Sequence, residues 1–80
     1  MKLTDAEIRG LEAVEAGRVT REYSANGNVF KTPRGVGPST IWRLERMKMI
    51  TDDRSPGHIV YGVLLTEKGK EALRKNRGEQ

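Results

Sequence analysis

The side chains best suited to chemistry in this chain lie on one face of a short helix predicted over residues 39–49. At 100° per residue, Arg43 and Arg46 fall opposite the apolar residues of that helix. Guanidinium groups pair with phosphates and with guanine edges. Ser39 and Thr40 lie near the helix start, where free backbone amides favour an anion. These residues predict recognition of a polyanion; the alternative is that the arginines are merely solvated.

Trp42, the only tryptophan, falls on the same outward face of the predicted helix. Its ring could stack on a sugar or a base, or anchor a protein interface, where Trp is enriched. The other interpretation is that Trp42 packs under residues 19–32, because a domain this small needs its largest aromatic side chain to complete the hydrophobic core. The sequence leaves both interpretations open.

Further basic residues lie outside this helix. Arg54 and His58 flank the tip of a polar loop over residues 51–58 and could reach a minor groove, although Asp52 and Asp53 at its base would repel phosphates. A second basic group is predicted on or beside residues 19–32, either as a phosphate clamp or as scattered surface charge: Arg18, Arg21, Lys31 and Arg34.

No catalytic arrangement is apparent in the sequence. The chain has no Cys, and His58 stands in a loop without an identifiable partner. The segment Gly35-Val36-Gly37 is too short to cradle a phosphate and no Lys-Ser/Thr pair follows it. The carboxylates expected on exposed positions are not paired for acid–base work: Glu12, Glu15, Glu22 and Glu45. We therefore predict a protein that is not an enzyme and needs no metal or cofactor.

Length and charge narrow the class further. Eighty residues predict one domain, over residues 1–76, with a frayed tail over 77–80. The net charge of +4 suits nucleic acid or another acidic surface. The chain shows no signal region and no apolar run of membrane-spanning length, so we expect no membrane partner and a cytoplasmic location in a bacterial host cell.

The elements that must position these residues can be predicted from local signals. Thr4 and Glu7 form a capping box for a helix over residues 5–16, and Gly17 suits its end. Alternating strand formers on both sides of Asn26-Gly27 predict a β-hairpin over about residues 19–32.

After the breaker-rich segment 33–38, Ser39 is the expected N-cap of the helix over 39–49. A strand starting at Met49-Ile50, the polar loop, and a strand over 59–65 should then form a second hairpin. Thr66 is expected to cap a last helix that buries Ala72 and Leu73.

The stretch from Ile41 to Leu73 resembles the winged helix-turn-helix superfamily, in particular bacterial regulators of the multiple-antibiotic-resistance type. The likeness lies in Arg43-Leu44-Glu45-Arg46-Met47-Lys48-Met49-Ile50 and in Leu65-Thr66-Glu67-Lys68-Gly69. The whole chain also resembles small proteins of actinobacteria and their phages that start a hairpin with Gly17-Arg18-Val19. The resemblance implies an α+β winged helix in the order α-β-β-α-β-β-α. The hairpin at about 19–32 takes the place of the usual second helix, which normally crosses the DNA backbone.

Two functions follow as the main expectations. The first is a small DNA-binding regulator or directionality factor that reads the major groove of double-stranded DNA with helix 39–49 and holds phosphates with the wing and the hairpin. A homodimer or tandem copies would then be needed for useful affinity. The second is a winged-helix module, of phage origin, that binds a host protein through Trp42 and the 19–32 hairpin. RNA binding is a third, weaker option.

Overall fold

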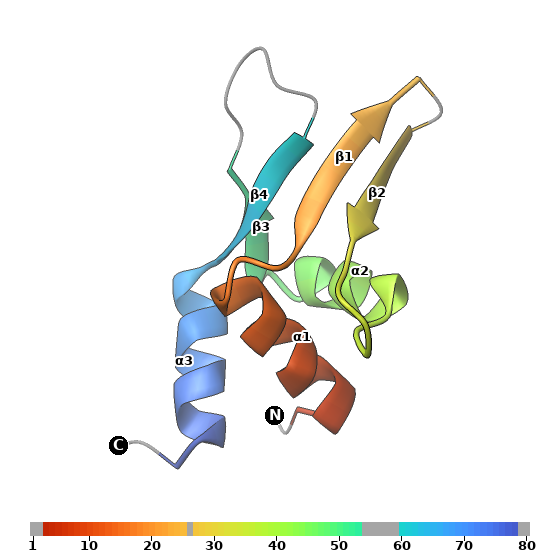
Figure 1. Cartoon of the computed structure of the whole chain (residues 1–80). Helices are drawn as coiled ribbons and strands as arrows, with labels where there is room; N and C mark the ends of the chain where they lie inside the picture. Colours follow the sequence, from red (N-terminus) through yellow and green to blue (C-terminus); the bar gives the residue numbers. More distant parts are fainter. Residues whose placement is uncertain (1–2, 26, 54–59, 79–80) are drawn as a thin grey trace.

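The computed structural model describes residues 3–25, 27–53 and 60–78. Over these residues the chain is an α+β domain, with three helices and a four-stranded antiparallel sheet (Figure 1). The predicted α+β class is confirmed. The elements follow one another as α1 (Asp5–Glu15), β1 (Thr20–Ser24), β2 (Gly27–Lys31), α2 (Pro38–Arg46), β3 (Ile50–Asp52), β4 (Val60–Leu65) and α3 (Glu67–Asn76).

Helix α1 begins and ends as the sequence predicts. The Thr4 hydroxyl accepts a hydrogen bond from the Glu7 amide, and the Glu7 carboxylate accepts one from the Thr4 amide, which completes the capping box. Gly17 follows the helix with a φ of 76°. The amide of Arg18 then donates to the carbonyl of Ala13 at 2.9 Å, as in a Schellman motif. The backbone of Arg18 is therefore fixed against the end of α1.

The sheet is built from two hairpins in the strand order β2-β1-β4-β3. The hairpin predicted at about residues 19–32 is present as β1 and β2, with Arg21 opposite Phe30 and Thr20 opposite Lys31. Strand β1 also pairs with β4, so the first hairpin is an integral part of the sheet. In Figure 1 both hairpins extend away from the helices in the same direction.

Helix α2 differs from its predicted bounds at both ends. Gly37 is the N-cap and Pro38 occupies the first turn, so Ser39 lies inside the helix and is not its cap. Proline suits the first helical position because its missing N–H would be unpaired there. The helix ends at Arg46, not at Met49, because Lys48 adopts a left-handed φ of 66°.

Hydrogen bonds of Thr66 connect the end of α2 to the start of α3. Thr66 donates a hydrogen bond from its hydroxyl to the Lys48 carbonyl at 2.6 Å and accepts one from the Gly69 amide at 3.2 Å. A Cβ atom on Gly69 would lie 2.1 Å from the carbonyl oxygen of Met49. The glycine is thus required by the close approach of α3 to the chain that follows α2.

The core lies between the helices and one face of the sheet. Its fully buried side chains are Leu11, Val19, Ile41, Leu44 and Leu73, which come from all three helices and from the entry to β1. Helices α1 and α2 meet closely at Gly10, whose added Cβ would lie 3.0 Å from a Leu44 methyl group. The packing of aliphatic side chains between α1 and α2 therefore fixes the position and orientation of α2.

Candidate functional site

The outward surface of α2 carries the predicted contact residues. Ser39, Arg43 and Arg46 are exposed, and so is Lys48 just after the helix. We call these four residues the α2 ridge. Thr40, predicted as a phosphate contact, is half-buried beside Gly10 of α1. The sequence did not predict Lys48 as a contact residue. The predicted helix extended to Met49, whereas the helix ends earlier and the turn after it leaves the Lys48 side chain exposed.

The α2 ridge is cationic because the only carboxylate of the helix, that of Glu45, is paired with a cation from the sheet. Glu45 accepts an ion pair from the guanidinium of Arg21 on β1. Arg43 lies 3.8 Å from the buried carboxylate of Glu7, yet 58% of its side chain remains exposed. Among the residues that the structure describes, Arg46 and Lys48 have no ion-pair partner. Their charges are therefore available to an anionic ligand.

Arg21 is the main correction to the predicted site. It was expected on the surface in a basic group, but the residue is only 8% exposed. Besides Glu45, its guanidinium contacts Asp52 at 3.5 Å and the side-chain oxygen of Asn28 at 2.9 Å. A phosphate clamp built on Arg21 is excluded, because its charge is used to join the hairpin, α2 and β3.

Three aromatic rings surround the guanidinium of Arg21. Its central carbon lies 5.3 Å from the ring centre of Tyr23, 4.9 Å from that of Phe30 and 5.0 Å from that of Trp42. These distances are within the range of cation–π attraction. The arrangement explains how an arginine is accommodated on the inner face of a sheet.

Trp42 is packed on one side and open on the other. Its ring meets Phe30 edge to face, with ring centres 4.8 Å apart, and the residue is 36% exposed. The interpretation that Trp42 packs under the hairpin is thus supported for one side of the ring. Only the remaining edge can contact a ligand.

The acidic base of the predicted wing is partly neutralised. Asp52 accepts a hydrogen bond from the Tyr23 hydroxyl at 3.0 Å, and its side chain is only 7% exposed. Asp53 is exposed, as expected. Of the two aspartates expected to repel phosphates, only Asp53 is therefore left with an exposed charge. Arg54 and His58, predicted at the wing tip, lie outside the described residues.

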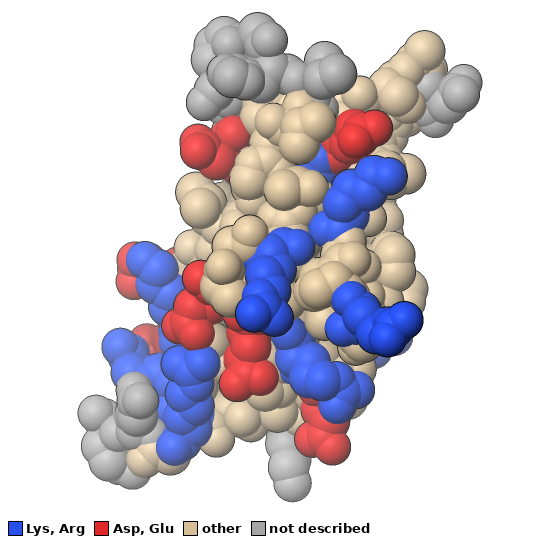
Figure 2. All heavy atoms as spheres, viewed as in Figure 1, with Lys and Arg blue, Asp and Glu red and all other residues tan. Residues whose placement is uncertain are grey.

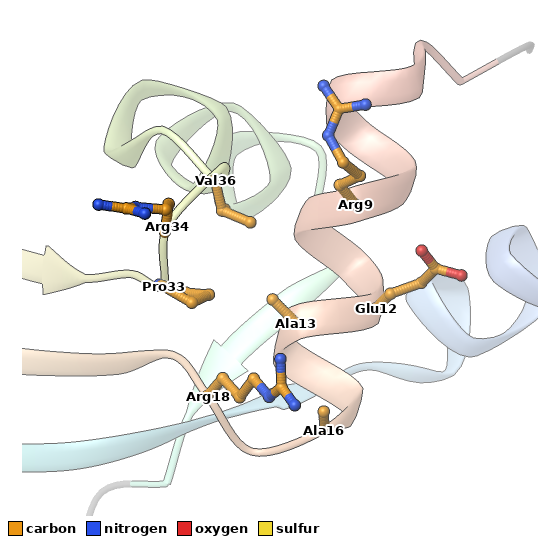
Figure 3. A pocket seen from close by; sticks show the side chains of 8 residues that line it. All are labelled: Arg9, Glu12, Ala13, Ala16, Arg18, Pro33, Arg34 and Val36. Atoms are coloured by element: carbon orange, nitrogen blue, oxygen red, sulfur yellow. The ribbon is translucent and has the colours of Figure 1, made fainter.

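A second basic surface lies between α1 and the connection to α2. Figure 2 shows Lys and Arg side chains gathered over this part of the molecule. A hollow of about 220 Å³ opens here, with Arg9, Arg18 and Arg34 around it (Figure 3). Arg34, predicted as a DNA contact, belongs to this hollow and not to the α2 ridge. The sequence did not predict Arg9 as a binding residue, because the pattern of the first helix indicates only which of its residues pack into the core.

Other site types find little support in the described part of the chain. Over residues 3–25, 27–53 and 60–78, no group of His, Asp or Glu side chains could hold a metal ion. Within the same ranges, no helix is long and apolar enough to cross a membrane. A hydrogen bond from Arg77 lowers the pKa of the Glu15 carboxyl group. Arg77, assigned to a frayed tail by the sequence, is the C-cap of α3 and lies 2.8 Å from that carboxylate.

Comparison of the chain with protein-family models, with curated proteins and with solved structures found no match.

Proposed function

We propose that this protein binds double-stranded DNA, with α2 entering the major groove in the manner of a winged helix. One observation carries the proposal: the α2 ridge presents only cations and a hydroxyl, while the carboxylate of Glu45 beside it is paired with Arg21 and only 30% of its side chain is exposed. A helix that enters the major groove must bring positive charge past the phosphates and donors to the base edges. The α2 ridge meets both needs.

The order of elements around α2 supports this assignment. Helix α2 is followed by the β3–β4 hairpin and then by α3, which is the helix–wing–helix order of the winged-helix fold. The β1–β2 hairpin stands where the positioning helix would be. Contacts of Phe30 with Trp42 and of Arg21 with Glu45 hold it against α2. In this proposal the first hairpin takes over the support of the recognition helix.

Each residue of the α2 ridge has a distinct role in the proposed complex. Arg43 and Arg46, one turn apart, contact guanine edges or phosphates. Ser39, in the first turn, holds a phosphate through its hydroxyl, because Pro38 has no amide hydrogen and the Thr40 amide donates to the Gly37 carbonyl at 3.1 Å. Lys48 contacts the backbone at the other end of the helix. A domain of 80 residues reads a short site, so we expect it to act as a dimer or in tandem copies.

The proposal is tested by fluorescence anisotropy with a labelled pool of random duplexes at two salt concentrations. We expect the variant Arg43→Gln/Arg46→Gln to bind roughly 10- to 100-fold more weakly, with the log–log salt slope reduced by about two. The control Arg74→Gln/Lys75→Gln removes the same charge from exposed positions on α3. Equal weakening in the control, or no duplex binding by the unchanged protein at low salt, would overturn the proposal.

A protein-binding module is the second candidate, and one feature of the sheet favours it. Val29, Val60 and Leu64 are about half exposed, at 51%, 45% and 50%, on the sheet face opposite Val63. Trp42 serves this function less well than expected, because one side of its ring is occupied by Phe30. A partner captured from nuclease-treated bacterial lysate, and lost with Val29→Ser/Leu64→Ser, would favour this candidate over DNA binding.

A further inference from the structure

We propose that the hollow lined by Arg9, Arg18 and Arg34 is a binding site for a ligand with two or more phosphate groups. We call it the arginine hollow. It lies between α1 and the segment that joins β2 to α2, and it shares no residue with the α2 ridge. The inference goes beyond the proposed function, because it does not require α2 to bind a duplex.

The backbone that carries two of the arginines is fixed. Arg18 is held by the 2.9 Å hydrogen bond of its amide to Ala13. Arg34 lies in a tight turn, in which the Val36 amide donates to the Pro33 carbonyl at 3.2 Å. The hydroxyl of Thr32 closes this turn with a 2.7 Å hydrogen bond to the Val36 carbonyl. The positions from which the Arg18 and Arg34 side chains project are therefore fixed, which lowers the part of the entropic cost of binding that comes from ordering the backbone.

The charges around the hollow are uncompensated. Within the described part of the chain, none of the three arginines forms an ion pair. The one carboxylate in the lining is Glu12, which points away from the hollow toward α3 (Figure 3) and lies 3.8 Å from Arg77. Three neighbouring like charges repel one another. A bound anion would relieve this repulsion.

The shape of the hollow selects the chemical class of the ligand. Its floor is apolar, from Ala13, Pro33 and Val36, and such a surface strengthens the attraction between a guanidinium and an anion. The volume of about 220 Å³ is smaller than a usual drug-sized pocket, so the rest of a larger ligand must stay outside. All three arginines line the hollow, but their guanidinium groups do not meet at one point: that of Arg18 lies beside Ala13 and Ala16, and that of Arg34 extends away from α1 (Figure 3). Several linked phosphates satisfy this geometry better than one.

Guanidinium groups pair with phosphate through two parallel hydrogen bonds, which favours an oxyanion of this kind over a halide. Linked phosphates of this kind occur in two sources. One is the backbone of a nucleic acid strand, and the other is a free oligophosphate such as a nucleoside triphosphate. The recognition chemistry is the same for both.

The first test titrates the isotope-labelled 80-residue protein with tripolyphosphate and follows the titration by NMR. We expect saturable shifts at the amides of Arg18, Arg34 and Val36, with a dissociation constant of roughly 1 mM or below. The variant Arg18→Gln/Arg34→Gln should weaken binding about tenfold, and the control Lys68→Gln/Arg74→Gln should not change it. Because these side chains are exposed, the variants should keep the native spectrum. No saturable shift up to about 10 mM, or equal loss in the control, would overturn the proposal.

The second test separates the two sources. If Arg18→Gln/Arg34→Gln also weakens duplex binding and lowers the salt slope, the phosphates belong to a nucleic acid strand. If duplex binding is unchanged while a nucleoside triphosphate shifts the same amides, the ligand is a free oligophosphate. Failure of duplex binding alone contradicts the proposed function and leaves the arginine hollow intact, since the tripolyphosphate titration is independent of it.

Discussion

The guanidinium of Arg21 on β1 and the carboxylate of Glu45 on α2 form an ion pair across 24 positions of the chain. The side chain of Arg21 is 9% exposed and that of Glu45 is 30% exposed. Asp52 on β3 shares the same cation. A single arginine therefore joins the first hairpin, the proposed recognition helix and the start of the second hairpin.

Loss of this cation should destabilise the fold. In Arg21→Gln the carboxylates of Glu45 and Asp52 would stay close together without compensation, so we expect the free energy of unfolding to fall by about 2–4 kcal/mol. Urea denaturation measures it. The control is Lys31→Gln, an exposed cation on β2 that should change stability by less than about 0.5 kcal/mol. Similar losses in both variants would contradict the central role of Arg21.

Truncation of Trp42 should also cost stability. In Trp42→Ala the packing against Phe30 and Arg21 is lost from one side of the ring only, so we expect about 2 kcal/mol, less than for a fully buried aromatic residue. Val29→Ala, on the exposed face of the neighbouring strand, is the matched control and should cost far less. An unchanged stability in Trp42→Ala would mean that the ring is free for a protein partner.

Gly69→Ala should destabilise the protein although alanine favours helices. The substitution gains up to about 1 kcal/mol of helix propensity. Its Cβ would collide with the Met49 carbonyl oxygen, 2.1 Å away, so α3 must shift from the end of α2. We expect a lower thermal midpoint, whereas Gly62→Ala, with open space around its Cβ position, should not show it. A rise in the midpoint for Gly69→Ala would show that α3 adjusts freely.

The contact of α3 with α1 predicts a pH effect at Glu15. The hydrogen bond from Arg77 lowers the pKa of Glu15 below its unfolded value. The associated stabilisation is therefore complete above the unfolded pKa, and it is lost as the pH falls through the folded pKa. In Arg77→Gln the pKa of Glu15 should rise toward its ordinary value, which a carbon-detected NMR titration of the carboxyl group measures. An unchanged pKa would mean that the contact is absent in solution.

Local signals were sufficient for most of the fold. The capping box at Thr4, the Gly17 terminus and the Thr66 cap each depend on residues within a few positions, so the sequence alone predicts them. The start of α2 was missed although its signal was present, since Pro38 in the first turn favours Gly37 as the cap over Ser39. The end of α2 could not be predicted, because a left-handed Lys48 has no sequence signature as strong as glycine.

The candidate site was less predictable than the fold. Arg43 and Arg46 were found because helical periodicity alone places them outward. Arg21 was misplaced because its partners, Glu45 and Asp52, are 24 and 31 residues away, and a charged residue in a strand is normally exposed. The alternation of Arg21 with the buried Val19 was the available hint. The arginine hollow combines three separate segments, which no local pattern can bring together.

The position of Trp42 has a practical consequence. It is the only indole in the protein, it touches the first hairpin on one side and it borders the α2 ridge on the other. Its fluorescence therefore reports two events without any added label: release of the hairpin from α2, which exposes the whole ring to water, and arrival of a ligand at α2, which covers the remaining edge. The two events should shift the emission in opposite directions.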